Sequence, residues 1–421
     1  MPRTIPAGAI ASNNTIATNY QTELVALRAA QVAGYFTVGS KAYFKDQLVG
    51  KRKGQTYGFV ITDHGEVANS LAKGAGEKDT IIEREVHLSI EPWHVFAKTN
   101  AVEGKTDLDF DREVAKDNGK ALIQKAVRKS IEKDFVKSAT CFIGDLGSFE
   151  PLSIATGHLS SVTSEPLYGF CDPMIESVVT SKGAQFVPVD APPMYKQGLI
   201  GHFHGADYRS QRFIPRVVIP SALTAAMAGA TFYAFNESTN KLTITFGVTA
   251  ASGFTIKKGT PFFISGVVAC DTIGDVTTEP YAFIVAEDKD VATSATSVEV
   301  LVDEVPVSVL GTRVAALEDG SIIEWTGGDA NVTSANTVTC PAAGTYLGAI
   351  IRADGAFEFE TLPDIDVAVA DSKKGSVEGI TIFQNRLVDL DEMSNDTRFD
   401  TFTLSGTVEK RAQALVLIKA K

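Results

Sequence analysis

The chain has 421 residues and a formal net charge of −12. At about 150 residues per domain, this length exceeds one ordinary hydrophobic core and predicts two or three compact units. The mean hydropathy is near zero and no apolar run approaches ~18 residues, which excludes a membrane-spanning helix. The acidic balance makes the chain a poor candidate for tight, sequence-specific binding to duplex nucleic acid.

Charge is distributed unevenly along the chain. Residues 1–53 contain seven basic and two acidic groups, a net charge of +5. Residues 222–345 contain fourteen acidic and five basic groups, a net charge of −9. The chain therefore begins with a basic segment and later contains a strongly acidic one.

Residues 1–41 are predicted to form an N-terminal arm. Asn13 or Asn14 is placed to cap a helix that runs to about Ala33, with Gly34 just past its end. The apolar residues that fall roughly on one face of this helix are Tyr20, Leu24, Leu27 and Val32. We expect the helix to dock on another surface through that face.

Residues 42–103 are predicted to form an extended two-stranded loop region. Tyr57–Thr62 and Ile81–Ile90 have the composition of strands, and the segment Asp63–Asp79 between them is rich in Gly, Lys and Glu. An isolated hairpin of this kind is only marginally stable in water. We therefore expect a neighbouring subunit to supply the missing partner surface, which indicates an assembly protein.

Charged side chains in or beside this loop are candidates for contacts between subunits. They are Lys51, Arg52, Lys53, Lys73, Glu77 and Lys78. The basic run at residues 51–53 is expected to meet acidic groups on the next subunit. A single surface pair contributes only about 0–1 kcal/mol, but a shell repeats it at every interface.

Residues 104–221 are predicted to contain a long helix and then a mixed α/β region. The helix is expected over Arg112–Phe135, with acids at its start, where they suit the helix dipole. Its apolar band consists of Ala115, Leu122, Ile123, Ala126, Val127, Ile131 and Phe135. A helix of this length spans roughly 36 Å and is long enough to organise a domain.

Residues 222–345 are predicted to form an inserted, β-barrel-like domain. The expected strands are Lys241–Phe246, Phe262–Val268, Tyr281–Ala286 and Ser297–Val302. Several short strands separated by turn clusters are typical of a closed or sandwiched all-β unit. Residues 346–421 then return to mixed character, with strands expected at Leu347–Ile351, Val377–Phe383, Thr401–Leu404 and Ala414–Lys419. The predicted fold class is α+β with an all-β insertion.

An acidic run imitates the start of a calcium-binding loop but fails at two positions. Asp107, Asp109 and Asp111 alternate as the first ligands of such a loop would. The sixth position is Arg112 where glycine is required, and the twelfth is Asn118 where glutamate is required. We interpret these acids as residues of a helix start.

No other pattern predicts a metal, cofactor or catalytic site. His202 and His204 share one side of a predicted strand, but no further ligand is visible nearby. The sequence contains neither the phosphate-binding string Gly-x-x-x-x-Gly-Lys-Ser/Thr nor the nucleophile motif Gly-x-Ser-x-Gly. The cysteines are too far apart for the common zinc and redox motifs and are predicted to be reduced, structural thiols: Cys141, Cys171, Cys270 and Cys340. The start of the chain lacks the layout of a secretory signal, so we expect a protein that stays in the cytosol.

Several segments together carry a family resemblance. They are Gly54-Gln-Thr-Tyr-Gly-Phe-Val-Ile, the run from Ile81 to Lys137, Leu242-Thr-Ile-Thr-Phe, Gly253-Phe-Thr-Ile-Lys-Lys-Gly-Thr-Pro-Phe-Phe-Ile-Ser-Gly-Val, Arg352-Ala-Asp-Gly-Ala-Phe-Glu-Phe-Glu-Thr-Leu-Pro and Asn385-Arg-Leu-Val-Asp-Leu-Asp-Glu. In these segments and in the order of its parts, the chain resembles the major capsid (coat) protein of tailed double-stranded DNA bacteriophages. That fold has an N-terminal arm, an extended loop, a spine helix, and peripheral and axial domains. An inserted β domain is the mark of the short-tailed Salmonella-phage-type subgroup.

The resemblance implies a structural subunit without catalytic activity. Such a subunit forms pentamers and hexamers of an icosahedral shell that encloses packaged double-stranded DNA, with a scaffolding protein and a portal protein as partners. It implies weak, nonspecific contact with the DNA, no membrane association, and a virion component assembled in the host bacterial cytoplasm. Some phage capsids also form a Lys–Asn crosslink, and the loop lysines lie where such a lysine would sit. The subgroup relies on noncovalent contacts, which favours solvated lysines here.

Two alternatives remain from the sequence. The acidic segment and the Thr-, Ser- and Val-rich texture are also compatible with a phage decoration or adhesin-type β-rich binding protein. That alternative predicts an independently folded, ligand-binding fragment 222–345 and a monomeric parent domain. A hydrolase is the weaker alternative, because no nucleophile–base pair is legible in the sequence.

Overall fold

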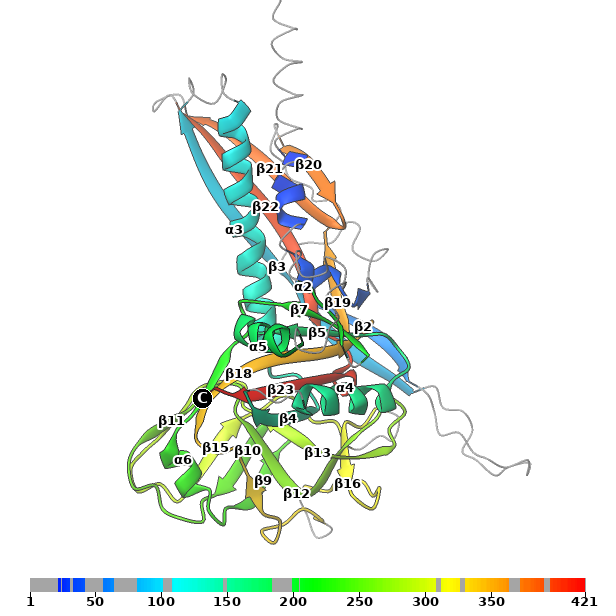
Figure 1. The fold of residues 1–421 in the computed structure, drawn as a ribbon, viewed down its shortest axis with the longest axis vertical. Helices are drawn as coiled ribbons and strands as arrows, with labels where there is room; N and C mark the ends of the chain where they lie inside the picture. The colour runs from blue at the N-terminus through cyan, green and yellow to red at the C-terminus, as the bar shows by residue number, and fades with distance from the viewer. Residues whose placement is uncertain are drawn as a thin grey trace, which may run out of the picture. The chain divides into compact units, whose positions relative to one another are not determined.

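The structure of the protein is a computed structural model with a mixed α+β fold, as predicted (Figure 1). It describes residues 22–23, 25–30, 33–41, 56–63, 82–100, 108–146, 150–183, 199–203, 205–307, 312–325, 330–362, 372–389 and 394–420. The chain divides into two compact units. Unit 1 comprises Met1–Gly58, His87–Ser130 and Glu358–Gly406, and unit 2 comprises Phe59–Val86, Ile131–Phe357 and Thr407–Lys421.

One seven-stranded sheet contains the long strands of unit 1. Its main path runs β1 (Ser40–Lys41), β19 (Phe357–Thr361), β22 (Ser394–Thr407), β21 (Ile380–Asp389) and β20 (Ser372–Val377). The strand β3 (Ile82–Asn100) pairs with β22, and β2 (Thr56–Asp63) pairs with β3. The predicted strands at Tyr57–Thr62 and Thr401–Leu404 are thus confirmed as parts of β2 and β22.

The strand β3 extends ten residues past Ile90, where the predicted strand ended. It continues because Ser394–Leu404 of β22 pairs antiparallel with Ile90–Asn100. The predicted pair of strands is confirmed, since β2 pairs with β3, and the part of β3 beyond Ile90 belongs to a larger sheet. The partner strand β22 lies about 300 residues further along the chain, so no local sequence pattern predicts this pairing.

The long helix is confirmed as α3 (Leu108–Asp134), which begins four residues before the predicted start. Acids are favourable anywhere in the first turn of a helix, so Asp109 and Asp111 lie inside the helix and do not precede it. Its predicted apolar band is buried at Leu122, Ile123, Ala126, Val127 and Ile131. At 1.5 Å per residue α3 is about 40 Å long.

The arm contains a helix at the described residues 22–23 and 25–30, but it docks through a different face from the predicted one. Leu27 is 39% exposed, whereas the buried residues are Val25, Ala26, Ala29 and Ala30. The reason is close backbone packing: a Cβ added at Gly119 of α3 would lie 2.6 Å from the Val25 carbonyl oxygen. Small side chains permit this approach, and a leucine does not. Tyr20, Leu24 and Val32 lie outside the described residues.

Gly34 does not end the arm helix in the way predicted. It begins a further helical turn, α2 (Gly34–Thr37), whose Tyr35 and Phe36 are buried. The Phe36 ring stacks on the Phe359 ring of β19, with centroids 4.3 Å apart. The aromatic residues after Gly34 therefore favour a second packed turn over a chain reversal.

The predicted strand Val377–Phe383 is confirmed only in part: Ile380–Phe383 lies in β21, but a hairpin turn separates it from Val377. Strand β20 ends at Val377 and β21 begins at Ile380. Glu378 has φ +50° and Gly379 has φ +79°. Positive φ at both central residues is typical of the type I′ turn that joins two twisted strands.

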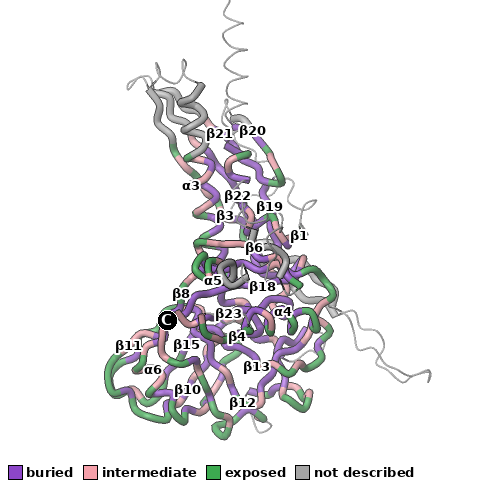
Figure 2. The backbone as a smooth tube through the Cα atoms, viewed as in Figure 1, coloured by how far each residue is buried: buried purple, intermediate pink, exposed green. Residues whose placement is uncertain are grey.

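A second seven-stranded sheet forms the centre of unit 2. Its order is β4 (Thr140–Asp145), β23 (Gln413–Lys419), β18 (Gly344–Ala353), β5 (Leu167–Cys171), β7 (Ala206–Ser210) and β6 (Leu199–Phe203), with β8 (Arg216–Ile219) paired to β18. Helix α4 (Glu150–Val162) packs Leu152, Ala155 and Leu159 into a core shared with β18 and β23. Helix α5 (Pro173–Gly183) follows β5. Figure 2 shows β18 and β23 as largely buried, and both contain strands predicted from the sequence.

Short strands follow between β8 and β18 in unit 2. After α6 (Ser221–Ala226) come β9 (Thr231–Asn236), β10 (Lys241–Thr245), β11 (Phe254–Ile256), β12 (Pro261–Cys270), β13 (Val276–Ile284), β14 (Lys289–Val291), β15 (Ser297–Leu301), β16 (Ala315–Leu317) and β17 (Val338–Thr339). Each of the four strands predicted here has a counterpart, in β10, β12, β13 and β15.

The pairing of these strands runs round a ring. The sheet β15-β10-β9 joins β17 through a bridge between Thr231 and Thr337, and β17 pairs with β12. Strand β12 pairs with β13, and a bridge between Val285 and Val302 leads back to the end of β15. The ring encloses aromatic side chains, among them Phe235 and Trp325, whose ring centroids are 4.9 Å apart. Such closure leaves few exposed strand edges.

Candidate functional site

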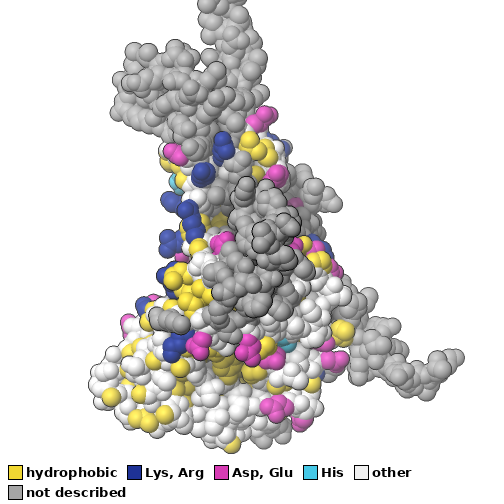
Figure 3. Space-filling view, in the orientation of Figure 1, with side chains coloured by type: hydrophobic (Ala, Val, Ile, Leu, Met, Phe, Trp, Pro, Cys, Tyr) yellow, Lys and Arg dark blue, Asp and Glu magenta, His cyan; other side chains and the backbone are white. Residues whose placement is uncertain are grey.

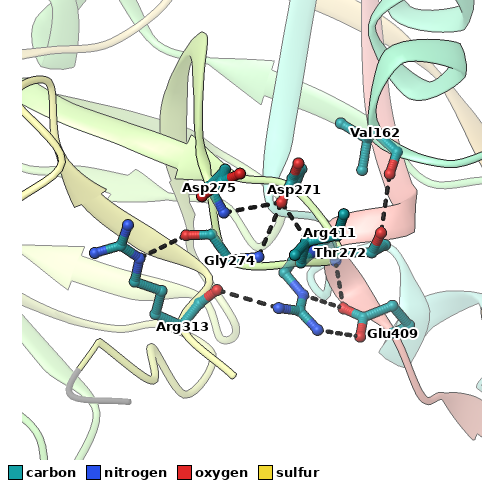
Figure 4. Close-up of polar contacts among 9 residues, drawn as sticks. Val162, Asp271, Thr272, Gly274, Asp275, Arg313, Glu409 and Arg411 are labelled. Atoms are coloured by element: carbon teal, nitrogen blue, oxygen red, sulfur yellow. Dashed lines mark hydrogen bonds and ion pairs between the residues drawn. The ribbon is translucent and has the colours of Figure 1, made fainter. Parts of the chain in front are cut away.

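A network of polar side chains lies just before β23, at Glu409 and Arg411 (Figure 4). Glu409 is the N-cap of the short 3-10 helix η3 (Lys410–Ala412) and accepts a hydrogen bond from the Arg411 backbone N–H at 3.1 Å. The Arg411 guanidinium donates to both carboxylate oxygens, from Nε to Oε1 at 2.9 Å and from Nη2 to Oε2 at 2.8 Å. The Arg411 side chain is 1% exposed and that of Glu409 is 16% exposed, so this bidentate pair is largely shielded from solvent.

A second arginine continues this network toward the ring of strands. Arg313 Nε donates to the Gly274 carbonyl oxygen at 2.7 Å, and Nη1 donates to that of Gly320 at 2.9 Å. The Arg313 carbonyl oxygen in turn accepts a hydrogen bond from Arg411 Nη1 at 3.5 Å. Two buried guanidinium groups therefore connect the C-terminal segment with the turn between β12 and β13.

The turn between β12 and β13 is fixed by a single carboxylate. Asp271 Oδ1 accepts hydrogen bonds from the backbone N–H groups of Ile273, Gly274 and Asp275, each at 2.9 Å. The Thr272 hydroxyl donates to the Val162 carbonyl oxygen at the end of α4, at 2.9 Å. Figure 4 shows this turn between Arg313 and Val162. The turn therefore contacts both Arg313, in the segment of the ring of strands, and the end of helix α4, which packs on the central sheet.

An ion pair adds a third connection in unit 2. Lys410 Nζ lies 3.0 Å from Asp303 Oδ2 and also donates to the Glu304 carbonyl oxygen. Burial alone would raise the pKa of Asp303, but the ammonium groups of Lys410 and Lys137 outweigh it and hold that pKa below its ordinary value. Asp303 therefore stays ionised and keeps the end of β15 close to η3. We call residues 409–411 with Asp271, Asp303 and Arg313 the junction.

An apolar contact accompanies the junction. The Phe135 ring, which follows α3 and is fully buried, fills a gap where two glycines face it. A Cβ added at Gly259, before β12, or at Gly348, in β18, would lie 2.6 Å from a ring carbon. The ring thus packs against the backbone of both the ring of strands and the central sheet. In chemical terms the junction is a structural clamp.

Helix α4 contains a buried histidine beside the central sheet. The His158 ring is 5.6 Å from the Phe142 ring of β4, centroid to centroid, and the residue is 9% exposed. Burial lowers the pKa of His158 from 6.5 to about 4. The folded protein therefore keeps this imidazole neutral in a pH range in which the unfolded chain protonates it.

We expect the free energy of unfolding of unit 2 to decrease as the pH is lowered, because of His158. The contribution is fully present above pH 6.5 and is lost as the pH falls toward 4, because the unfolded state then binds a proton that the folded state does not. The difference corresponds to about 3 kcal/mol at most. Urea unfolding of the unaltered chain and of His158→Gln at pH 7.5 and pH 5 measures it. The variant should lose less stability on acidification, and an equal loss in both proteins would contradict the assignment.

The structure does not test the six predicted contact residues. Lys51, Arg52, Lys53, Lys73, Glu77 and Lys78 all lie outside the described residues, as does His204. His202 lies in β6, but its side chain is likewise outside what the structure describes. The candidate inter-subunit contacts therefore stay predictions.

The cysteines are free thiols, as predicted. Burial raises the pKa of Cys141 and Cys171 well above the ordinary value and that of Cys270 and Cys340 to about 11. These thiols pack as small apolar groups.

The described residues offer neither a metal site nor a membrane-spanning helix. They contain no group of three or more His, Cys, Asp or Glu side chains arranged to hold a metal ion. Within the same residues, no helix is both long and apolar enough to cross a membrane.

Sequence reasoning missed the junction, and only part of it has a local signal. Glu409 and Arg411 are two positions apart, where an N-cap acid often meets a nearby base. The partners Arg313 and Asp303 are about a hundred residues away, which no spacing rule connects. A buried arginine in β18, Arg352, was also missed; it lies between the rings of Phe170 and Phe357, at 4.8 and 4.1 Å from their centroids.

No protein-family model matches the sequence, and no curated protein matches it. In solved structures the chain is similar to one from Mycobacterium phage Che8, with 9% identity over 90% of this chain and 89% of that chain and a TM-score of 0.43. It is similar to a chain of the capsid of Ralstonia phage GP4, with 6% identity, coverage of 91% and 92%, and a TM-score of 0.41. It is also similar to a chain of a virus-like particle from Pyrococcus furiosus, with 8% identity, coverage of 94% and 97%, and a TM-score of 0.39.

Proposed function

We propose that this chain is the structural subunit of an icosahedral virus shell, the major capsid protein of a tailed double-stranded DNA phage. The order of its structural parts carries the proposal. A pair of extended strands, β2 and β3, is followed by the 27-residue helix α3, a mixed sheet, a ring of short strands, and a return to the same mixed sheet through β18 and β23. That order is the one implied by the sequence resemblance to the tailed-phage capsid family.

We further propose that residues 222–345 form a domain inserted into the parent fold, as in the short-tailed Salmonella-phage-type subgroup. The chain leaves the central sheet at β8 and returns to it at β18, and these two strands are antiparallel neighbours with Ile219 opposite Gly344. A long segment whose two ends meet side by side is tolerated by the parent fold, because its removal leaves both ends in register. The ring of strand pairing within the segment supports the same division.

In this proposal the chain has no catalytic role, and its partners are further copies of itself. Pentamers and hexamers enclose packaged double-stranded DNA, and a scaffolding protein and a portal protein take part in assembly in the bacterial cytoplasm. The loop residues 51–53, 73, 77 and 78 contribute inter-subunit contacts. With a net charge of −12, the shell contacts its DNA only weakly and nonspecifically, which favours later release of the genome.

Electron microscopy of the purified chain, alone and coexpressed with a scaffolding protein, tests the proposal. Shells, rings or capsomers are the expected result. Monodisperse monomers under all conditions would contradict it and would favour the alternative of a decoration or adhesin-type β-rich binding protein. That alternative predicts a ligand-binding fragment 222–345 and a parent domain that never associates.

A further inference from the structure

An exposed aromatic residue in the middle of β3 is unusual for a strand held in a large sheet. Phe96 is 62% exposed, and Pro92 and His94 on the same face of the strand are also exposed. The opposite face of β3 lies against α3, because Lys129 Nζ of α3 is 5.5 Å from the Trp93 ring centroid and 3.2 Å from Glu91 Oε1. Trp93 also donates from Nε1 to the Thr403 hydroxyl of β22 at 2.9 Å. The two faces of this sheet are therefore used differently.

Phe96 is held in place by two neighbours on its own face. The Arg398 guanidinium of β22 lies over the Phe96 ring, 5.5 Å from its centroid, and Arg398 is the register partner of Phe96. The His94 ring approaches the Phe96 ring edge-on, with centroids 5.4 Å apart. These contacts restrict the rotation of the phenyl ring, so little side-chain entropy is left to lose when a partner binds.

The buried carboxylate of Asp400 holds the Arg398 guanidinium in place. Asp400, which is 4% exposed, accepts hydrogen bonds from Arg398 Nε at 2.7 Å and from Asn385 Nδ2 at 2.8 Å. One side of the guanidinium is thereby used within the sheet, while the Arg398 side chain is still 40% exposed. A rigid exposed aromatic ring with an arginine stacked on it has the composition of an interface hot spot.

We propose that Phe96, together with Arg398 and His94, anchors a contact between two copies of this chain. Charge argues for a second copy as the occupant. The strand register places Arg398 and Lys374 on this face, where Lys374 is exposed and the Arg398 side chain is 40% exposed, whereas Asp400 is buried. The chain as a whole carries a net charge of −12, so another copy offers an acidic surface complementary to a basic, aromatic one. The inference rests on the proposed self-assembly and adds a specific residue to it.

Two matched variants test this anchor. Phe96→Thr removes the ring and keeps a residue that suits a strand, and Tyr233→Thr does the same at an exposed aromatic residue of β9, 69% exposed. Sedimentation velocity over a concentration series gives the concentration at which each full-length chain assembles. Phe96→Thr should raise that concentration about tenfold or more, the effect of losing one hot-spot residue. Tyr233→Thr should change it less than about twofold, because this residue lies outside the proposed contact.

A third variant keeps the test valid if Phe96→Thr folds poorly. Arg398→Lys retains the charge but removes the planar stacking group, and it should also raise the assembly concentration. Assembly of Phe96→Thr and Arg398→Lys at the concentration of the unaltered chain would overturn the inference and leave the proposed function standing. Normal self-assembly with a selective loss of binding to a scaffolding protein would likewise overturn it. Failure of the unaltered chain to assemble at all would overturn the proposed function and the inference with it.

Discussion

Replacing Phe135 with alanine is expected to destabilise unit 2 by about 3–5 kcal/mol, the usual cost of deleting a fully buried aromatic ring. The cavity left by the ring would stay unfilled on two sides, because Gly259 and Gly348 face it and have no side chains that could move into it. Urea unfolding followed by circular dichroism measures the loss. A loss below about 1 kcal/mol would contradict the packing described for this ring.

The same contact can be tested from its other side. Gly348→Ala places a Cβ 2.6 Å from Phe135, 2.8 Å from Ile214 and 2.9 Å from the Pro215 carbonyl oxygen, so the substitution overpacks the site. Gly157→Ala in α4 is the matched control, since a Cβ there meets nothing within 4 Å, and it should be neutral or stabilising. In the double variant Phe135→Leu with Gly348→Ala, the costs should be less than additive, because the smaller side chain relieves the clash.

Local patterns predicted the elements of this fold better than their partners. The apolar band of α3 and the alternation in β10 and β15 are properties of neighbouring residues, and they appear where expected. The extension of β3 beyond Ile90 depends on β22, and the arm helix docks on Gly119 through alanines because of a backbone approach that no periodicity encodes. Long-range pairing and close backbone contact are set by the tertiary structure, so they remain hidden in a single sequence.

The candidate sites show the same limit. The sequence predicted inter-subunit contacts in the charged loop at residues 51–53 and 73–78, because charged residues are concentrated there. Those residues lie outside the described part of the chain. The junction and Phe96 were not singled out, because an arginine, a glutamate and a phenylalanine in ordinary surroundings carry no motif. What distinguishes them is burial in one case and exposure in the other: Arg411 is 1% exposed and Phe96 is 62% exposed.

Arg411→Met should cost about 3–5 kcal/mol of unfolding free energy, because it leaves the Glu409 carboxylate without its bidentate partner in a site that solvent reaches poorly. The junction also loses the hydrogen bond to the Arg313 carbonyl oxygen, so the connection between β23 and the ring of strands weakens. We expect the loss to appear in unit 2, measured by urea unfolding and by hydrogen exchange in β12 and β13.

The double variant Glu409→Gln with Arg411→Met separates the value of the ion pair from the cost of a lone buried charge. It should be less destabilised than Arg411→Met alone, because no unpaired carboxylate remains. Lys241→Met is the surface control: its partner Glu299 is 2.7 Å away, but both side chains are nearly half exposed, so the change should stay within about 1 kcal/mol. If Arg411→Met and Lys241→Met lowered the free energy of unfolding equally, the junction would be a surface contact and could not hold the ring of strands to the central sheet. A large loss in Arg411→Met, recovered in part by the double variant, would instead identify the junction as a buried clamp of the subunit.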